Sequence, residues 1–131
     1  MARVKASGRY RYNEYFMDDD EDANVTTTNT FTSVYSSGDV WTELQSIDQV
    51  TVQIRNTHAA NGLSYQILAS LDSSIAKAQW PVLKASTNLA GSTTAFETLD
   101  TNTWKYLDVQ VKSQVADTAS TVRTWIHGES T

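Results

Sequence analysis

The sequence predicts an all-β protein: an antiparallel β-sandwich, jelly-roll-like, with about eight strands and an extended N-terminal arm. Two observations predict the sandwich. Apolar and polar residues alternate one by one in several segments, as they do in a strand with one buried face, and no long segment has helical spacing. A third observation predicts the arm, because the first 22 residues differ in composition from the rest of the chain.

The clearest alternation lies in residues 49–56, where Val50, Val52 and Ile54 alternate with polar residues. We expect this segment to be the central strand, with one dry and one wet face. The same rhythm returns in 63–70, 104–112 and 121–127. In 104–112 we expect Leu107, Val109 and Val111 to share one face. In 121–127 we expect Val122 and Ile126 to point inward and Arg123 and Trp125 outward, or the reverse.

Weaker patterns predict the remaining strands. Residues 25–35 are rich in Thr and Asn and fit an edge strand, and 40–44 fit a short strand or bend. Residues 93–99 form a predicted strand with Phe96 directed inward. Pro81 restricts residues 80–85 to an edge position, because proline donates no hydrogen bond to a ladder.

Turn signals suggest how these strands are joined. Asn61-Gly62 is a strong turn pair, because both residues tolerate positive φ, so we expect 49–56 and 63–70 to form a hairpin with a long loop. Residues 75–80 are ambiguous and fit one helical turn.

Composition excludes several classes of protein. At 131 residues the chain fits one domain with a tail, and its net charge of −5 argues against a general nucleic-acid binder. There is no cysteine for a disulfide, a thiol nucleophile or a Cys-based zinc site, and no apolar run long enough for a membrane span. The N-terminal residues lack the apolar stretch of a secretion signal, so we expect a protein made in the cytoplasm.

We interpret residues 1–30 as an arm and residues 31–131 as the sandwich domain. The arm begins with a basic half, continues through four aromatic residues and ends in an acidic run. A segment of this kind is expected to become ordered against a neighbouring molecule; the alternative is a terminal strand packed on its own domain. The residues expected to make contacts are Arg3, Lys5, Arg9, Tyr10, Arg11, Tyr12, Tyr15, Phe16, Asp18, Asp19 and Asp20.

No catalytic signature is present, so we expect no enzyme activity, no cofactor and no metal. His58 and His127 are interpreted as two exposed histidines, because a catalyst needs converging partners. Residues 18–22 have carboxylates at alternate positions, as at the start of a calcium loop, but Ala23 stands where its glycine would be. A solvated or partner-facing acidic run is the preferred interpretation.

Two further binding hypotheses rest on aromatic and basic residues. Trp41 and Trp125 are candidate ligand or interface aromatics, since an indole can stack on a sugar ring or fill a subunit interface. The basic half of the arm, with Tyr10 and Tyr12, could contact nucleic acid through phosphates and stacking. The acidic run that follows would repel it, so nucleic acid is not the expected partner.

The sequence resembles a known type of virion protein in three segments. These are 53–56 (Gln-Ile-Arg-Asn), 61–72 (Asn-Gly-Leu-Ser-Tyr-Gln-Ile-Leu-Ala-Ser-Leu-Asp) and 106–113 (Tyr-Leu-Asp-Val-Gln-Val-Lys-Ser). They are similar to small β-sandwich, jelly-roll-like virion proteins of tailed bacteriophages and related viruses, of the minor capsid and decoration type. The resemblance covers residues 47–127 and not 1–30. It departs from the family pattern at Leu71-Asp72-Ser73-Ser74, where such sequences often have Asp-Gly.

The resemblance implies a non-enzymatic capsid or decoration subunit, located in the virion and made in the host cytoplasm. Its expected partners are copies of itself, as a homo-oligomer, and another capsid protein, reached through the arm and one sandwich face. The oppositely charged halves of the arm suit head-to-tail contact between subunits. The alternative is a carbohydrate- or receptor-binding β-sandwich module of a phage fibre or adhesin.

Overall fold

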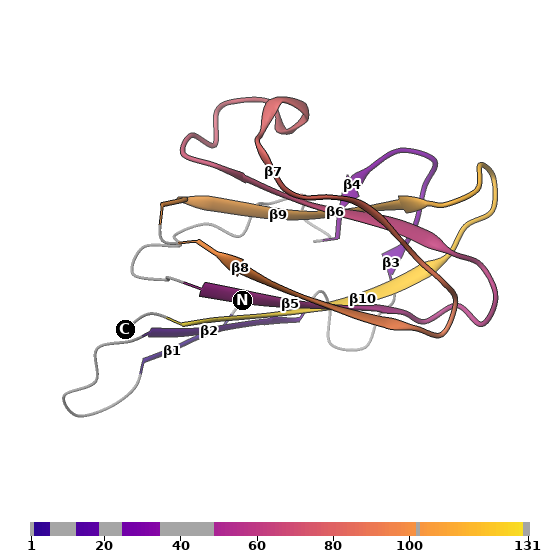
Figure 1. Ribbon diagram of the computed structural model, residues 1–131, viewed down its shortest axis with the longest axis horizontal. Coiled ribbons are helices and arrows are strands. Elements are labelled where there is room, and N and C mark those ends of the chain that lie inside the picture. Colours follow the sequence, from indigo (N-terminus) through magenta and orange to yellow (C-terminus); the bar gives the residue numbers. More distant parts are fainter. Residues whose placement is uncertain (1, 6–12, 19–24, 35–48, 102, 130–131) are drawn as a thin grey trace.

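The computed structural model describes residues 2–5, 13–18, 25–34, 49–101 and 103–129. These residues form two antiparallel sheets stacked as two layers (Figure 1). The strands are β1 (Ala2–Lys5), β2 (Asn13–Asp18), β3 (Val25–Thr26), β4 (Thr32–Ser33), β5 (Gln49–Asn56), β6 (Leu63–Ser70), β7 (Val82–Leu89), β8 (Thr94–Asp100), β9 (Tyr106–Ser113) and β10 (Thr121–Glu129). One 3-10 turn, η1 (Lys77–Gln79), confirms the helical turn expected within residues 75–80.

The strand order is that of a jelly roll. Sheet A has the order β1-β2-β10-β5-β8, with β3 also pairing with β10, and sheet B has the order β4-β9-β6-β7. From β3 onward, each connection between described strands crosses to the other sheet, except the one from β6 to β7. The eight strands from β3 to β10, four in each sheet, are wound in this way into the double Greek key of a jelly roll, and β1 and β2 extend sheet A. The predicted fold class is therefore confirmed.

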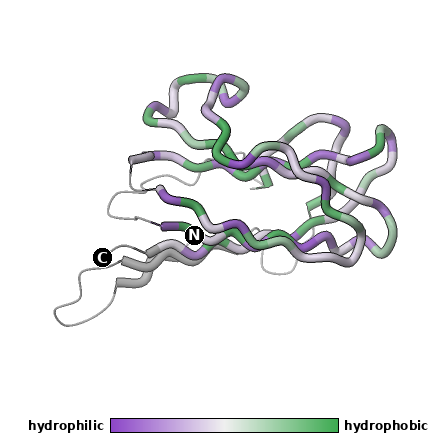
Figure 2. The backbone as a smooth tube through the Cα atoms, in the orientation of Figure 1, coloured by the Kyte–Doolittle hydropathy of each residue, from purple (hydrophilic) through white to green (hydrophobic). Residues whose placement is uncertain are grey.

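The core lies between the two sheets, and the period-two pattern sets which residues enter it. Figure 2 shows hydrophobic stretches, in green, along the backbone of both layers. Strand β5 alternates strictly between half-exposed and buried residues. Each apolar side chain fully removed from water contributes about 1.5–3 kcal/mol before entropy is subtracted. The core-facing residues on the four central strands are Val50, Val52, Ile54, Leu63, Tyr65, Ile67, Ala69, Leu107, Val109, Val111, Val122 and Ile126.

The predicted hairpin of residues 49–56 and 63–70 is wrong. Strand β5 pairs with β10 and β8 in sheet A, whereas β6 pairs with β9 and β7 in sheet B. The six residues between β5 and β6 carry the chain from one layer to the other, so the two apolar faces pack against each other. A turn pair such as Asn61-Gly62 reports local backbone freedom, and it does not distinguish a hairpin from a crossover.

The inward orientation predicted for Phe96 is also wrong, because its side chain is 64% exposed. The half-buried residues of β8 are Ala95, Glu97 and Leu99 on the inner side, together with Thr94 at the strand start. Glu97 is held inside by a hydrogen bond from the Tyr65 hydroxyl and by Lys84, whose Nζ is 3.6 Å from the Glu97 carboxylate. These contacts come from sheet B, so the pattern within β8 did not contain them.

One buried asparagine, Asn56, ties together the loops at one end of the sandwich. Its amide nitrogen donates to the backbone oxygens of Asn61 and Leu89, at 2.9 and 3.0 Å. Its amide oxygen accepts from the His58 N–H and the Ser120 hydroxyl, at 3.0 and 2.8 Å. All four hydrogen-bonding positions of the side chain are thus used, which offsets the cost of burying it.

Strands from the first 30 residues pair within the same chain. Strand β2 pairs with β1 and with the C-terminal part of β10, and β3 pairs with the N-terminal part of β10. This pairing matches the alternative of a terminal strand on its own domain. The division into an arm of 1–30 and a sandwich of 31–131 stays a prediction. The strand expected at 40–44 lies outside the described residues.

Candidate functional site

Among the described strands of the outer face of sheet A, β8 is the more exposed, since Phe96, Thr98 and Asp100 are exposed whereas Thr51, Gln53 and Arg55 of β5 are half-buried. Residues that alternate with the buried ones face outward, among them Gln53 and Arg55 on β5 and Phe96 on β8. Gln53 and Phe96 are direct neighbours across the two strands. Phe96 is therefore a large exposed apolar side chain among the polar outward residues Thr94, Thr98 and Asp100 of its strand.

Strand β10 adds an aromatic and basic pair to this face. The Arg123 guanidinium lies 5.1 Å from the centre of the Trp125 ring, and Trp125 is opposite Gln53 in the strand pairing. Arg55 is held nearby, because its guanidinium donates to the Ser92 carbonyl and the Thr94 hydroxyl, each at 3.0 Å. These contacts hold the half-buried side chains of Arg55, Arg123 and Trp125 in defined positions on this face.

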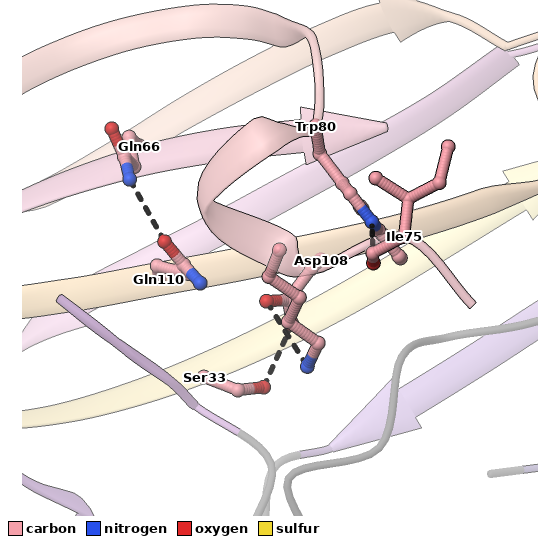
Figure 3. A network of polar contacts seen from close by, with 7 residues as sticks. Ser33, Gln66, Ile75, Trp80, Asp108 and Gln110 are labelled. Atoms are coloured by element: carbon pink, nitrogen blue, oxygen red, sulfur yellow. Dashed lines mark hydrogen bonds and ion pairs between the residues drawn. The ribbon is translucent and has the colours of Figure 1, made fainter. Parts of the chain in front are cut away.

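The outer face of sheet B is different, because β6 and β9 are buried on both faces. Residues 71–81, which we call the strap, connect β6 to β7 and contribute side chains to this face. Figure 3 shows Asp108 of β9 at the centre of the polar contacts. Its carboxylate accepts from the Ser33 hydroxyl at 2.7 Å and lies 3.3 Å from the Lys77 Nζ. Beside it, the Gln66 amide donates to Gln110 at 2.8 Å.

Trp80 anchors the end of the strap. It is 4% exposed, and its indole N–H donates to the Ile75 carbonyl at 2.8 Å (Figure 3). Its ring centre lies 6.4 Å from that of Tyr106 on β9. A buried indole with its N–H bonded combines a large apolar contact with a satisfied polar group.

The electrostatics of the strap follow from burial. Removal from water raises the pKa of Asp108, whose side chain is fully buried, while the Ser33 hydrogen bond and the Lys77 charge act in the opposite direction. Burial also raises the pKa of Tyr65, and the hydrogen bond with Glu97 adds to that rise. Both groups connect elements that are distant in sequence: Asp108 joins β9 to Ser33 of β4 and to Lys77, and Tyr65 joins β6 to Glu97 of β8.

The two histidines are half-buried, so the expectation that they are exposed is not met. The Nδ1 of His58 accepts from the backbone N–H groups of Ala60 and Asn61, at 3.0 and 2.9 Å, which assigns it a role in shaping its loop. Within the described ranges, no group of three His, Cys, Asp or Glu side chains could hold a metal ion. No helix in the same ranges is long and apolar enough to span a membrane.

The predicted arm residues are distributed over strands and undescribed segments. Arg3 and Lys5 lie in β1, and Tyr15, Phe16 and Asp18 lie in β2. The backbone register places Asp18 opposite Trp125 and Phe16 opposite His127. The remaining predicted contact residues lie outside the described part: Arg9, Tyr10, Arg11, Tyr12, Asp19, Asp20 and Trp41.

Sequence reasoning missed Phe96 and Gln53 as residues of one open face. The signal was present in 94–100, where Phe96 shares its alternate positions with Thr94, Thr98 and Asp100. Three of these four residues are polar, which indicates an outward face even though the fourth is aromatic. Of the two tryptophans singled out, Trp125 lies on this face, as its pairing with Gln53 shows.

The sequence matches no protein-family model, and it matches none of the curated proteins. Among solved structures, it is similar to a subunit of Bacillus endospore appendages, described as disulfide-linked pili, with 11% identity, a TM-score of 0.53, and coverage of 98% of this chain and 96% of that chain. It is also similar to a chain of the infectious bursal disease virus particle, with 11% identity and a TM-score of 0.54.

The viral match covers 97% of this chain but only 35% of the viral chain, so this chain spans about a third of that protein's length. A third similar structure is PirA, with 19% identity, a TM-score of 0.52, and coverage of 87% of this chain and 93% of that chain. At these identities the likeness concerns the fold alone. It agrees with the jelly-roll strand order derived from the strand pairing.

Proposed function

We propose that this protein is a non-enzymatic structural subunit of a virion, of the capsid or decoration type. It assembles with copies of itself and with another capsid protein through residues 1–30 and one sandwich face. The observation that carries the proposal is the contrast between the two outer faces. The outer face of β6 and β9 in sheet B is buried by the protein's own chain, whereas β8 of sheet A exposes Phe96 on the same face as the half-buried Arg123–Trp125 pair.

Two features support a role in assembly. The particle of infectious bursal disease virus and the Bacillus pili are assemblies built from chains with this fold, which makes the fold suitable for such use. The first 30 residues also contribute β1, β2 and β3 to the edge of sheet A, next to the open face. Contacts from these residues and from the face could therefore act on the same neighbouring subunit.

The first test is the assembly state of the full-length protein. We expect a concentrated sample to form oligomers in native mass spectrometry and regular particles or arrays in electron micrographs. A chain that stays monomeric at every concentration, and that binds no capsid protein of its source, would contradict the proposal.

A charge-reversal experiment separates the N-terminal segment from the sandwich. We expect Arg9→Glu with Arg11→Glu to abolish assembly, because the basic half would lose its acidic partner. Lys105→Glu with Lys112→Glu is the matched control, since it changes the net charge equally but in β9 and the turn before it. Equal loss in both variants would indicate a general charge effect and would remove the N-terminal segment from the proposal.

The second candidate function is binding of a carbohydrate or a receptor, as in a phage fibre or adhesin module. Trp125 beside Gln53 favours it, because sugars bind to exposed indole rings flanked by amides. The Arg123 guanidinium, however, lies over the Trp125 ring, where a sugar would stack. A glycan screen followed by tryptophan fluorescence distinguishes the two functions: binding that Trp125→Ala abolishes would favour the module.

A further inference from the structure

The four outermost strands of the two sheets differ in how open their edges are. Strand β1 has four residues and includes Arg3 and Lys5, and β4 has two residues. Strand β7 pairs with β6 through two register shifts. Basic residues, short length and irregular pairing all discourage a strand from another molecule from adding to an edge.

Strand β8 has none of these protections. It has seven residues, contains no Lys, Arg or Pro, and pairs with β5 in unbroken register. Among the strands that the structure describes, none lies beyond it. Its one inward charge, Glu97, is engaged by Tyr65 and Lys84 of its own chain. The edge of β8 is thus the most regular free edge in the described part of the protein.

The backbone pairing shows which groups of β8 are free. The Asn56 N–H donates to the Thr93 carbonyl at 2.9 Å, so these two residues form a hydrogen-bonded pair. Because such pairs alternate along antiparallel strands, Ala95, Glu97 and Leu99 bond to β5. Thr94, Phe96 and Thr98 therefore direct their N–H and C=O groups toward the open edge.

We propose that the edge of β8 binds β8 of a second copy of this chain, in antiparallel register about a two-fold axis at Phe96. In this register Phe96 stands opposite Phe96 of the second copy, and Thr94 stands opposite Thr98. Every free backbone group of these residues finds a partner, and two sheets A join into one. This inference refines the self-assembly proposed above. It depends on that proposal for the identity of the partner, which is a second copy of this chain.

Side-chain chemistry selects this register. An aromatic pair and two threonine pairs on the same face are among the favourable cross-strand neighbours of antiparallel strands. Glu97 stands opposite Ala95 of the second copy, so like charges do not meet. A register shifted to centre on Glu97 would place two carboxylates directly opposite each other, which destabilises strand pairing.

The size of the contact sets the expected affinity. Seven residues from each copy make an interface smaller than the standard size for stable complexes. We therefore expect a dimer that dissociates on dilution and becomes stable only where other contacts add to it, as in a larger assembly.

Cysteine cross-linking tests the register directly, because the chain contains no cysteine of its own. Phe96→Cys should form a covalent dimer on mild oxidation, since hydrogen-bonded neighbours lie about 5.5 Å apart between Cα atoms, within disulfide range. Thr98→Cys alone should not, but a mixture of Thr94→Cys and Thr98→Cys should form a mixed dimer. Cross-linking of Phe96→Cys with Thr98→Cys would instead indicate the register centred on Glu97 and would overturn the proposed one.

Sedimentation velocity on the chain without cysteines gives the second measurement. Over protein concentrations from about 1 μM to about 1 mM, Phe96→Lys should weaken self-association by at least about tenfold, because two lysines would meet at the axis. Ser86→Lys is the matched control, because it adds the same charge at an exposed position of β7 in the other sheet. Circular dichroism confirms that both variants fold.

The outcomes separate this inference from the proposed function. If ordered assembly occurs but Phe96→Cys does not cross-link, the β8 contact is overturned and the structural role stays intact. The same conclusion follows if Phe96→Lys and Ser86→Lys assemble alike. A cross-linked β8 dimer that never forms larger assemblies supports the contact and counts against the virion role.

Discussion

The two outer faces of the sandwich differ in what covers them. On sheet B, the strap brings Lys77 to the buried carboxylate of Asp108 and packs Trp80 near Tyr106. On sheet A, the outward residues of β5 are half-buried, and Phe96 of β8 is 64% exposed. The comparison teaches that burial on the outside of a sandwich comes from a specific connection, and that the face without one is available to a partner.

The largest effect should come from removing the anchor of the covered face. We expect Trp80→Ala to lower the free energy of unfolding by about 3–5 kcal/mol, because a buried indole leaves a cavity and its hydrogen bond to Ile75 is lost. Urea denaturation followed by circular dichroism measures it. Phe96→Ala on the open face should change stability by no more than about 0.5 kcal/mol. Similar losses in both variants would show that the two faces do not differ in this way.

A smaller loss should follow removal of the buried carboxylate. We expect Asp108→Ala to destabilise the protein by about 1–3 kcal/mol, because the Ser33 hydroxyl loses its acceptor and Lys77 its counter-charge. A double-mutant cycle with Lys77→Ala isolates the ion pair from the hydrogen bond. Additive effects of the two substitutions would mean that the pair does not fasten the strap.

The pH dependence of stability should reveal how Asp108 is buried. Its pKa is raised in the folded protein, mainly by loss of hydration, so the folded state holds the proton more tightly than the unfolded state. The contribution of Asp108 to the free energy of unfolding is therefore greatest below its ordinary pKa, and it is lost as pH rises through the raised pKa of the folded state.

Comparison of the wild type with Asp108→Asn isolates this effect, because the other titrating groups are common to both proteins. Between pH 7 and about pH 4, near the ordinary pKa of aspartate, the wild type should gain stability relative to the variant. A relative loss over the same interval would show that the attraction of Lys77 outweighs the cost of burial.

The smallest effect on stability should come from the open face. We expect Trp125→Ala to cost no more than about 1 kcal/mol in the monomer, since its contact with Arg123 lies on the half-exposed face of β10. Thermal unfolding of dilute protein measures the stability, and native mass spectrometry of concentrated protein measures assembly. A large loss of stability would assign Trp125 to the packing of the monomer and would weaken the case for an interface here.

Much of the local structure was predictable from the sequence. Strands β5 and β6 have the predicted bounds, because side-chain alternation depends only on the strand itself. Trp125 was singled out for the same reason. For β10 the pattern left two orientations open, and the structure has the one with Val122 and Ile126 in the core. The exposed position of Phe96 was not predicted, because it depends on Tyr65 and Lys84, which hold Glu97 inside from the other sheet.

By itself, the sequence determined that the chain forms strands with one apolar face, since a two-residue period in hydrophobicity is a local property. Only the tertiary structure decided which strands pair, because the choice between a hairpin and a crossover after Asn56 depends on contacts with β8 and β10. It also decided which outer face stays open. That depends on where residues 71–81 lie. Their position is set by the contact of Lys77 with the buried Asp108 of β9, which the sequence of 71–81 alone does not predict.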